Sequence, residues 1–106
     1  MTTNSDWEIF KVIKEKALDR YCERSLENVE KMIWNSKASN QQRFHDLFDL
    51  MQESNVKLGD IFDGHSQSKA YFQLLLMRRE GLVEDEELEG LTEEILAFSD
   101  PDKDLK

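Results

Sequence analysis

Residues 5–34 read SDWEIFKVIKEKALDRYCERSLENVEKMIW, without a proline or a glycine. Apolar or small residues recur along this stretch in steps of three and four, which is the spacing of one face of an α-helix. This stripe consists of Trp7, Phe10, Ile13, Ala17, Tyr21, Ser25, Val29 and Ile33, with Leu18, Cys22 and Leu26 beside it. Ser5 and Glu8 have the spacing of a capping box. The stretch therefore predicts one long helix from about residue 7 to residue 34.

The length of this helix constrains the architecture. A helix over residues 6–34 would be roughly 43 Å long at ~1.5 Å per residue, whereas a compact domain of this size is about 33 Å across. The apolar stripe continues over the whole helix, so part of it would extend beyond the domain. A second copy of the chain is the simplest cover, and we expect an elongated homodimer. The alternative is a break near Ser25, which would give a compact bundle.

A second helix is expected after the polar segment 35–40. Residues 39–42 have capping-box spacing, and the helix should run from there to about Ser54. Its apolar stripe consists of Phe44, Leu47, Phe48 and Met51. Together with the stripe of the first helix, we expect these four residues to form the dimer interface. A turn is expected near Asp63 and Gly64.

Two more helices complete the predicted fold. The third should run from about residue 66 to Gly81, and its almost wholly apolar middle, residues 70–77, indicates the buried centre of a small head region. The fourth should run from about residue 84 to 98, with acidic residues in its first turn, where the helix dipole favours them. The fold class is thus all-α: a long helical hairpin plus a small helical head region, in a single domain over residues 1–106 with disordered ends at about 1–4 and 100–106.

Composition excludes several function classes. The chain has 106 residues and a net charge of −9, which argues against nucleic acid as a partner because phosphate binding needs a basic face. No apolar run approaches the ~20 residues that span a bilayer, and the N-terminus lacks the pattern of a secretory signal. One cysteine, Cys22, is consistent with a reducing compartment, so we expect a cytoplasmic protein.

Motifs for catalysis are absent from the sequence. There is no nucleophile-elbow, phosphate-loop or dinucleotide motif, and the two histidines and one cysteine have no metal-ligand spacing. Cys22, beside the apolar stripe, is expected to be a small buried thiol. We therefore expect no catalytic residues, no metal and no cofactor, and interpret the chain as an interaction protein.

Several segments are similar to those of one known family. Residues 79–83 read REGLV and residues 86–88 read EEL, while residues 46–50 read DLFDL and residues 63–64 read DG. In order and position these segments resemble the KEGLV, EEL, DLWKL and DG segments of the cyanobacterial fluorescence recovery proteins. The resemblance covers roughly residues 10–95, and the Gly-Leu-Val motif is its most specific part.

The resemblance implies a function without chemistry. Proteins of this family are all-helical, elongated homodimers that hold no cofactor. They bind the photoactivated orange carotenoid protein, speed its return to the resting form and help to detach it from the phycobilisome, so that quenching ends. A location near the thylakoid surface would follow in a cyanobacterium.

The resemblance also assigns site residues. The family's recognition patch on the second helix carries Trp, His, Asp and Arg where this sequence has Phe48, Met51, Gln52 and Leu58, and Phe72 corresponds to an aromatic residue of the head. Leu47 matches the leucine of the family's dimer seam. Because the polar groups of the patch are replaced, we expect weak or absent action on the carotenoid protein. The alternative is a helical dimer with an unrelated protein client outside photoprotection, for which the acidic surface would suit a basic partner.

Overall fold

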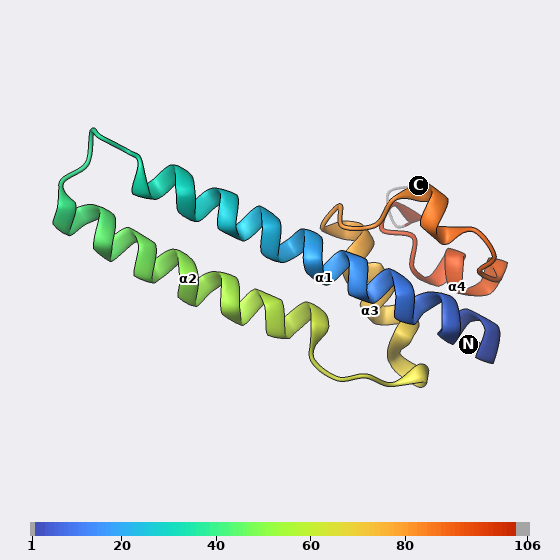
Figure 1. The fold of residues 1–106 in the computed structure, drawn as a ribbon. Helices are drawn as coiled ribbons and strands as arrows, with labels where there is room; N and C mark the ends of the chain where they lie inside the picture. Colours follow the sequence, from blue (N-terminus) through green and yellow to red (C-terminus); the bar gives the residue numbers. More distant parts are fainter. Residues whose placement is uncertain (1, 104–106) are drawn as a thin grey trace.

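The computed structural model describes residues 2–103 and contains only helices and turns within them. The elements in chain order are α1 (Asn4–Ile33), α2 (Asn40–Phe62), the short 3₁₀ helix η1 (Gln67–Lys69), α3 (Ala70–Arg79), the 3₁₀ helix η2 (Asp85–Leu88) and α4 (Glu93–Phe98). Helices α1 and α2 form a long antiparallel hairpin (Figure 1). Residues 67–103, here called the head, pack against the half of the hairpin that contains the N-terminus (Figure 1). The all-α hairpin-plus-head prediction is confirmed.

Helix α1 is unbroken over its 30 residues, so the prediction of one long helix is confirmed and the alternative of a break near Ser25 is wrong. Its cap lies two residues earlier than predicted. The Thr3 side chain accepts a hydrogen bond from the Asp6 backbone N–H at 3.0 Å, and the Asp6 carboxylate accepts one from the Thr3 backbone N–H at 3.2 Å. Thr3 and Asp6 thus form the capping box that was assigned to Ser5 and Glu8. The ends expected to be disordered lie partly outside the described residues, at 1 and 104–106.

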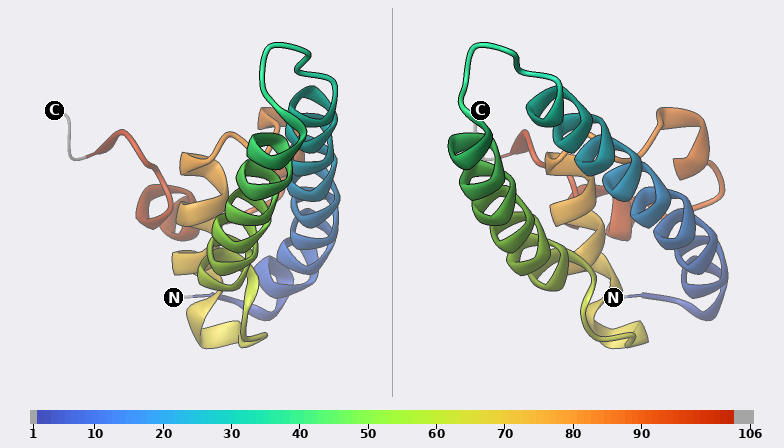
Figure 2. Two further views of the ribbon diagram at one scale, coloured as in Figure 1. Left: turned by 90° about the vertical axis from the view of Figure 1, so that its left-hand side faces the viewer. Right: turned by 60° about the vertical axis from the view of Figure 1, so that its left-hand side comes forward.

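The core occupies one end of the hairpin. Only the stretch of the α1 stripe from Phe10 to Tyr21 is buried, while Val29 is half-buried and Ile33 is exposed. The buried apolar residues are Phe10, Ile13, Ala17, Tyr21, Ile61, Phe62, Ala70, Leu74, Met77, Leu82, Leu91 and Ile95. The molecule measures 52 × 30 × 21 Å, and the closing turn of the hairpin lies at the end opposite the head (Figure 1), while Figure 2 shows the head packed behind the hairpin. As predicted, part of α1 therefore extends beyond the core of the domain.

Helix α2 is longer than its sequence predicted, because it continues through Gly59 to Phe62 rather than ending near Ser54. Ile61 and Phe62 are buried against the core, and this burial outweighs the low helix propensity of the glycine. The turn predicted after it is confirmed, since Gly64 has a φ of +84°.

The head differs from the prediction at its C-terminal side. Helix α3 is its central buried element, as expected, with Leu74 and Met77 inaccessible to solvent. The single helix predicted over residues 84–98 is wrong, because η2 and α4 are separated by a turn at Gly90, whose φ is +89°. A Cβ at Gly90 would come within 3.0 Å of the Ile9 Cδ1 atom. Close packing of this turn on α1 thus interrupts the helix.

Candidate interaction surface

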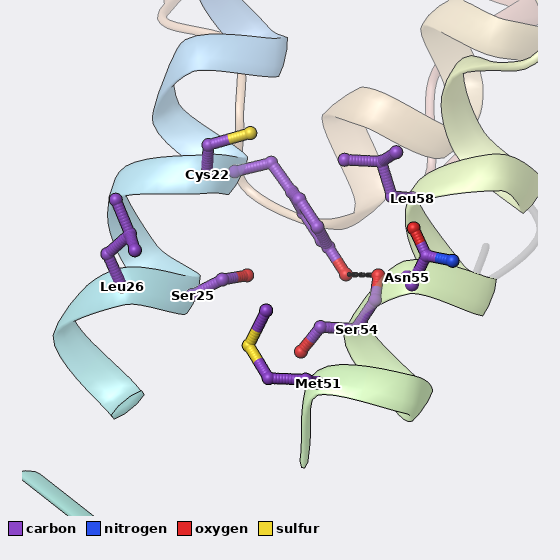
Figure 3. A pocket seen from close by; sticks show the side chains of 8 residues that line it. Cys22, Ser25, Leu26, Met51, Ser54, Asn55 and Leu58 are labelled. Atoms are coloured by element: carbon purple, nitrogen blue, oxygen red, sulfur yellow. Dashed lines mark hydrogen bonds between the residues drawn. The ribbon is translucent and has the colours of Figure 1, made fainter. Parts of the chain in front are cut away.

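A groove runs between the two hairpin helices (Figure 3). It has a volume of about 220 Å³. Its lining comes from α1 (Tyr21, Cys22, Ser25, Leu26) and from α2 (Met51, Ser54, Asn55, Leu58). The Tyr21 hydroxyl donates a hydrogen bond to the Ser54 carbonyl at 2.7 Å and so ties the two helices together at this point. The small serine side chains between the helices leave the groove open.

Exposed apolar side chains continue from the groove along both helices. Phe48 and Phe44 precede Met51 by three and seven residues, which places all three on the same side of α2. They are 56, 77 and 48% exposed, respectively. On α1, Leu18, Cys22 and Leu26 repeat every four residues and are all exposed. These six residues (Leu18, Cys22, Leu26, Phe44, Phe48 and Met51) are here called the hairpin face. An apolar strip of this kind is typical of an interaction site.

The predicted dimer residues are found in two environments. Phe44, Phe48 and Met51 are exposed and belong to the hairpin face. Leu47 is half-buried within the single chain. Three of the four residues are therefore exposed to a partner.

The predicted partner-binding residues are not all neighbours. Phe48 and Met51 belong to the hairpin face, and Gln52 is exposed on α2. Leu58 lines the groove but is half-buried and packs on the core. Phe72 lies on α3 in the head and is 52% exposed.

The α1 half of the surface was missed at the sequence level. Cys22 was expected to be buried, but it is exposed and lines the groove. The signal was present in the spacing of Leu18, Cys22 and Leu26, which was assigned to the margin of the buried stripe. A sequence does not show which of two adjacent stripes its own domain will cover.

The segment 79–88, which carries the resemblance to the fluorescence recovery proteins, connects the head to the hairpin. Arg20 of α1 donates two hydrogen bonds to the Glu87 carboxylate, at 2.6 and 2.8 Å, and one to the Leu82 carbonyl at 2.9 Å. Arg24 donates to the Glu80 carbonyl at 2.9 Å. The Arg20 hydrogen bonds lower the pKa of Glu87 to about 2. This segment therefore fixes the position of the head relative to α1.

Two further kinds of site are not found among the described residues. Within residues 2–103, no group of three or more His, Cys, Asp or Glu side chains is placed to hold a metal ion. None of the helices in that range combines the length and the apolar character needed to cross a membrane.

The chain matches no family model, and no curated protein or solved structure matches it either.

Proposed function

We propose that this chain is a non-enzymatic regulatory protein of the fluorescence recovery type, which works as a homodimer and binds the orange carotenoid protein or a related client. The observation that carries the proposal is the hairpin face, with Phe44, Phe48 and Leu26 exposed along the part of the hairpin that the head does not cover. The segment 79–88 supports the family assignment through its motif. The hydrogen bonds from Arg20 of α1 to this segment give the motif a structural role, which is to hold the head on the hairpin.

A second copy is the proposed cover of the hairpin face. Covering one Leu, Met or Phe side chain contributes about 1.5–3 kcal/mol, whereas association costs about 4–15 kcal/mol. Several apolar side chains must therefore be covered at once. A two-fold arrangement does this, because each copy contributes the same six residues.

The expected action on the carotenoid protein is weak. An interface hot spot combines a buried aromatic residue with fixed polar partners, and Phe48 retains only the ring. Client groups that face Gln52 and Leu58, two positions outside the hairpin face where the family has Asp and Arg, would be left unpaired at ~1–3 kcal/mol each. Two such losses weaken binding by roughly a hundredfold.

The test is a gain of function in the colour reversion of photoactivated orange carotenoid protein. The variant Phe48→Trp, Met51→His, Gln52→Asp changes only exposed residues, and we expect it to speed reversion at least tenfold over the unchanged chain. Leu58→Arg is added in a separate variant, because Leu58 packs on the core. Val56→His is the matched control, since Val56 is 65% exposed on the same helix but outside the hairpin face.

Two outcomes would contradict this proposal. Strong acceleration by the unchanged chain would place recognition elsewhere, with Phe72 on the head as the first candidate. No acceleration by the restored variant would favour the alternative, a helical dimer with an unrelated client. The net charge of −9 together with the apolar side chains at 51 and 58 supports a client that is basic and apolar in that case.

A further inference from the structure

The hairpin face carries both an exposed ring and a hollow. Phe48 of α2 is 56% exposed, and the groove beside it has a volume of about 220 Å³ that the chain's own side chains leave open. Figure 3 shows that the small side chains of Ser25 and Ser54 lie between the two helices at this point. Stable interfaces are packed about as densely as protein interiors, so a partner that covers this face must fill the groove.

The ring and the groove lie at equal distances from Met51. Along α2, Phe48 lies three residues from Met51 towards the closing turn of the hairpin, and Ser54 lies three residues from it towards the head. Each step is about 4.5 Å at ~1.5 Å per residue. Ser54 is also in the middle of the α2 residues that line the groove, which span positions 51–58.

The ends of the hairpin face are also nearly equidistant from Met51. The hydrogen bond from Tyr21 to the Ser54 carbonyl places these two residues at the same level of the hairpin. By this alignment, Leu18 lies about 9 Å from Met51 towards the head, and Phe44 lies about 10 Å from it towards the turn. Rotation by 180° about an axis through Met51 therefore exchanges the two ends of the face, and it also exchanges the ring with the groove.

We propose that a second copy packs antiparallel on the hairpin face, about a two-fold axis near Met51, so that Phe48 of each copy fills the groove of the other. Phe44 of each copy then covers the partner's Leu18. This inference rests on the homodimer proposed above, to which it adds the orientation of the two copies and the side chain that anchors them.

The charges beside the face suit this antiparallel orientation. Residues 31–45, around the closing turn, contain no Asp or Glu and three cationic residues, Lys31, Lys37 and Arg43. At the other end of the face, α1 exposes the carboxylates of Glu15 and Asp19, while the neighbouring Lys16 and Arg20 pair with a carboxylate of the head. An antiparallel pair brings the cationic end of each copy to the acidic end of the other, whereas a parallel pair brings like charges together.

The parallel orientation would also leave the groove empty. With the two-fold axis along the hairpin, Phe48 would meet the partner's Phe48, and the two grooves would face each other. An unfilled void of this kind is destabilising, because the side chains that line it lose packing contacts. Only the antiparallel orientation places a ring of one copy at the level of the hollow of the other.

The test maps the orientation with single cysteines. Cys22→Ser removes the native thiol, and one chain then carries Phe44→Cys while a second chain carries Leu18→Cys. The two chains are mixed, at a concentration where light scattering gives the dimer mass, and are oxidised mildly. We expect disulfides between the two different chains, and few between identical ones, on a non-reducing gel. Val56→Cys, on the same helix but outside the face, replaces Phe44→Cys as the control and should give no disulfide with Leu18→Cys.

This test separates the two orientations sharply. In a parallel dimer, positions 18 and 44 of different copies would be about 20 Å apart along the hairpin, whereas a disulfide needs Cα atoms within about 7 Å. Disulfides between identical chains, or none in a sample of dimer mass, would overturn the antiparallel arrangement while leaving the homodimer intact. A single-chain mass at every concentration would instead contradict the proposed homodimer itself, and the arrangement with it.

A second measurement tests whether Phe48 fills the groove. Ser25→Phe places a ring in the groove from the chain's own α1, and it should raise the dimer dissociation constant at least about tenfold, as expected when one anchoring side chain is displaced. Ser5→Phe, an exposed site on α1 outside the face, should leave the constant unchanged. Circular dichroism checks that both variants keep their helices.

The variant Phe48→Ala decides whether the two rings compete for the groove. In this background the groove is vacated, so Ser25→Phe should cause no further weakening of the dimer. If Ser25→Phe weakens the unchanged chain and the Phe48→Ala chain equally, or weakens neither, the partner's Phe48 does not occupy the groove and the proposal is overturned. If Ser25→Phe loses its helices, the disulfide mapping decides alone.

Discussion

At the scale of single residues, Asp6 joins the first helix to the last. It is inaccessible to solvent, and it accepts hydrogen bonds from the Thr3 backbone and from the Thr92 backbone and hydroxyl, both of the latter at 2.8 Å. Burial raises the pKa of Asp6, but the hydrogen bonds from Thr92 and Thr3 outweigh it and the pKa is lowered. Thr3 is a local partner that the sequence spacing could have indicated. Thr92 is 86 residues away, and only folding brings it there.

The position of the first helix cap gives one prediction. Thr3→Ala should lower the free energy of unfolding by about 1 kcal/mol, because the Asp6 backbone N–H loses its acceptor. Ser5→Ala is the matched control and should change it by less than about 0.5 kcal/mol. Urea denaturation of both variants measures this. If Ser5→Ala lowers the free energy of unfolding more than Thr3→Ala does, the helix is capped by Ser5 and not by Thr3.

The Arg20–Glu87 contact gives a pH dependence. The folded-state pKa of Glu87, about 2, lies below its usual value of 4.5. Its stabilising contribution is therefore complete above about pH 5 and is lost as the pH falls from there towards 2. Glu87→Gln should lower the free energy of unfolding at pH 7 by about 1.5–3 kcal/mol and flatten its acid dependence.

The control for this pair is Glu86→Gln. Glu86 is exposed on the same 3₁₀ helix, so its loss should leave the acid dependence intact. Chemical denaturation at several pH values compares the two variants. An unchanged acid limb in Glu87→Gln would mean that another carboxylate is responsible.

At the scale of elements, hydrophobic spacing was enough to predict that α1, α2 and α3 are helices. This spacing failed where contacts with residues far away in the sequence determine where a helix ends. Helix α2 extends beyond Ser54 because Ile61 and Phe62 find the core. The last helix is split because Gly90 packs on Ile9 and Asp6 binds Thr92. Neither partner is visible from the local sequence.

Helix α3 offers a comparison of neighbours. Leu74 is inaccessible to solvent, whereas Leu75 is half-buried, although the sequence of this segment is apolar on almost all sides. Leu74→Ala should lower the free energy of unfolding by about 2–5 kcal/mol, and Leu75→Ala should cost clearly less. Thermal or urea denaturation of both variants measures the two losses of unfolding free energy. Equal costs would show that the helix is rotated from the orientation described.

At the scale of the whole molecule, the hairpin is longer than the head can cover. The sequence predicted this from the length of the first helix, and it also predicted the α2 half of the exposed surface, Phe44, Phe48 and Met51. It did not predict the α1 half, because Cys22 and Leu26 lie next to a stripe that looked equally fit for burial. Which stripe faces the head depends on the orientation of α1 about its own axis, and this orientation is the one that buries Phe10 and Tyr21.

The most direct test of the central claim is the molar mass of the chain in solution, measured by light scattering on a sizing column. The chain mass is 12.5 kDa, and we expect twice that mass for the unchanged protein. Phe48→Glu places a charge in the hairpin face and should give the single-chain mass, since an unpaired charge in an interface is strongly destabilising. Val56→Glu, at a site on α2 that is also exposed but lies outside that face, should keep the dimer mass. A single-chain mass for the unchanged protein, or an intact dimer in Phe48→Glu, would contradict the account.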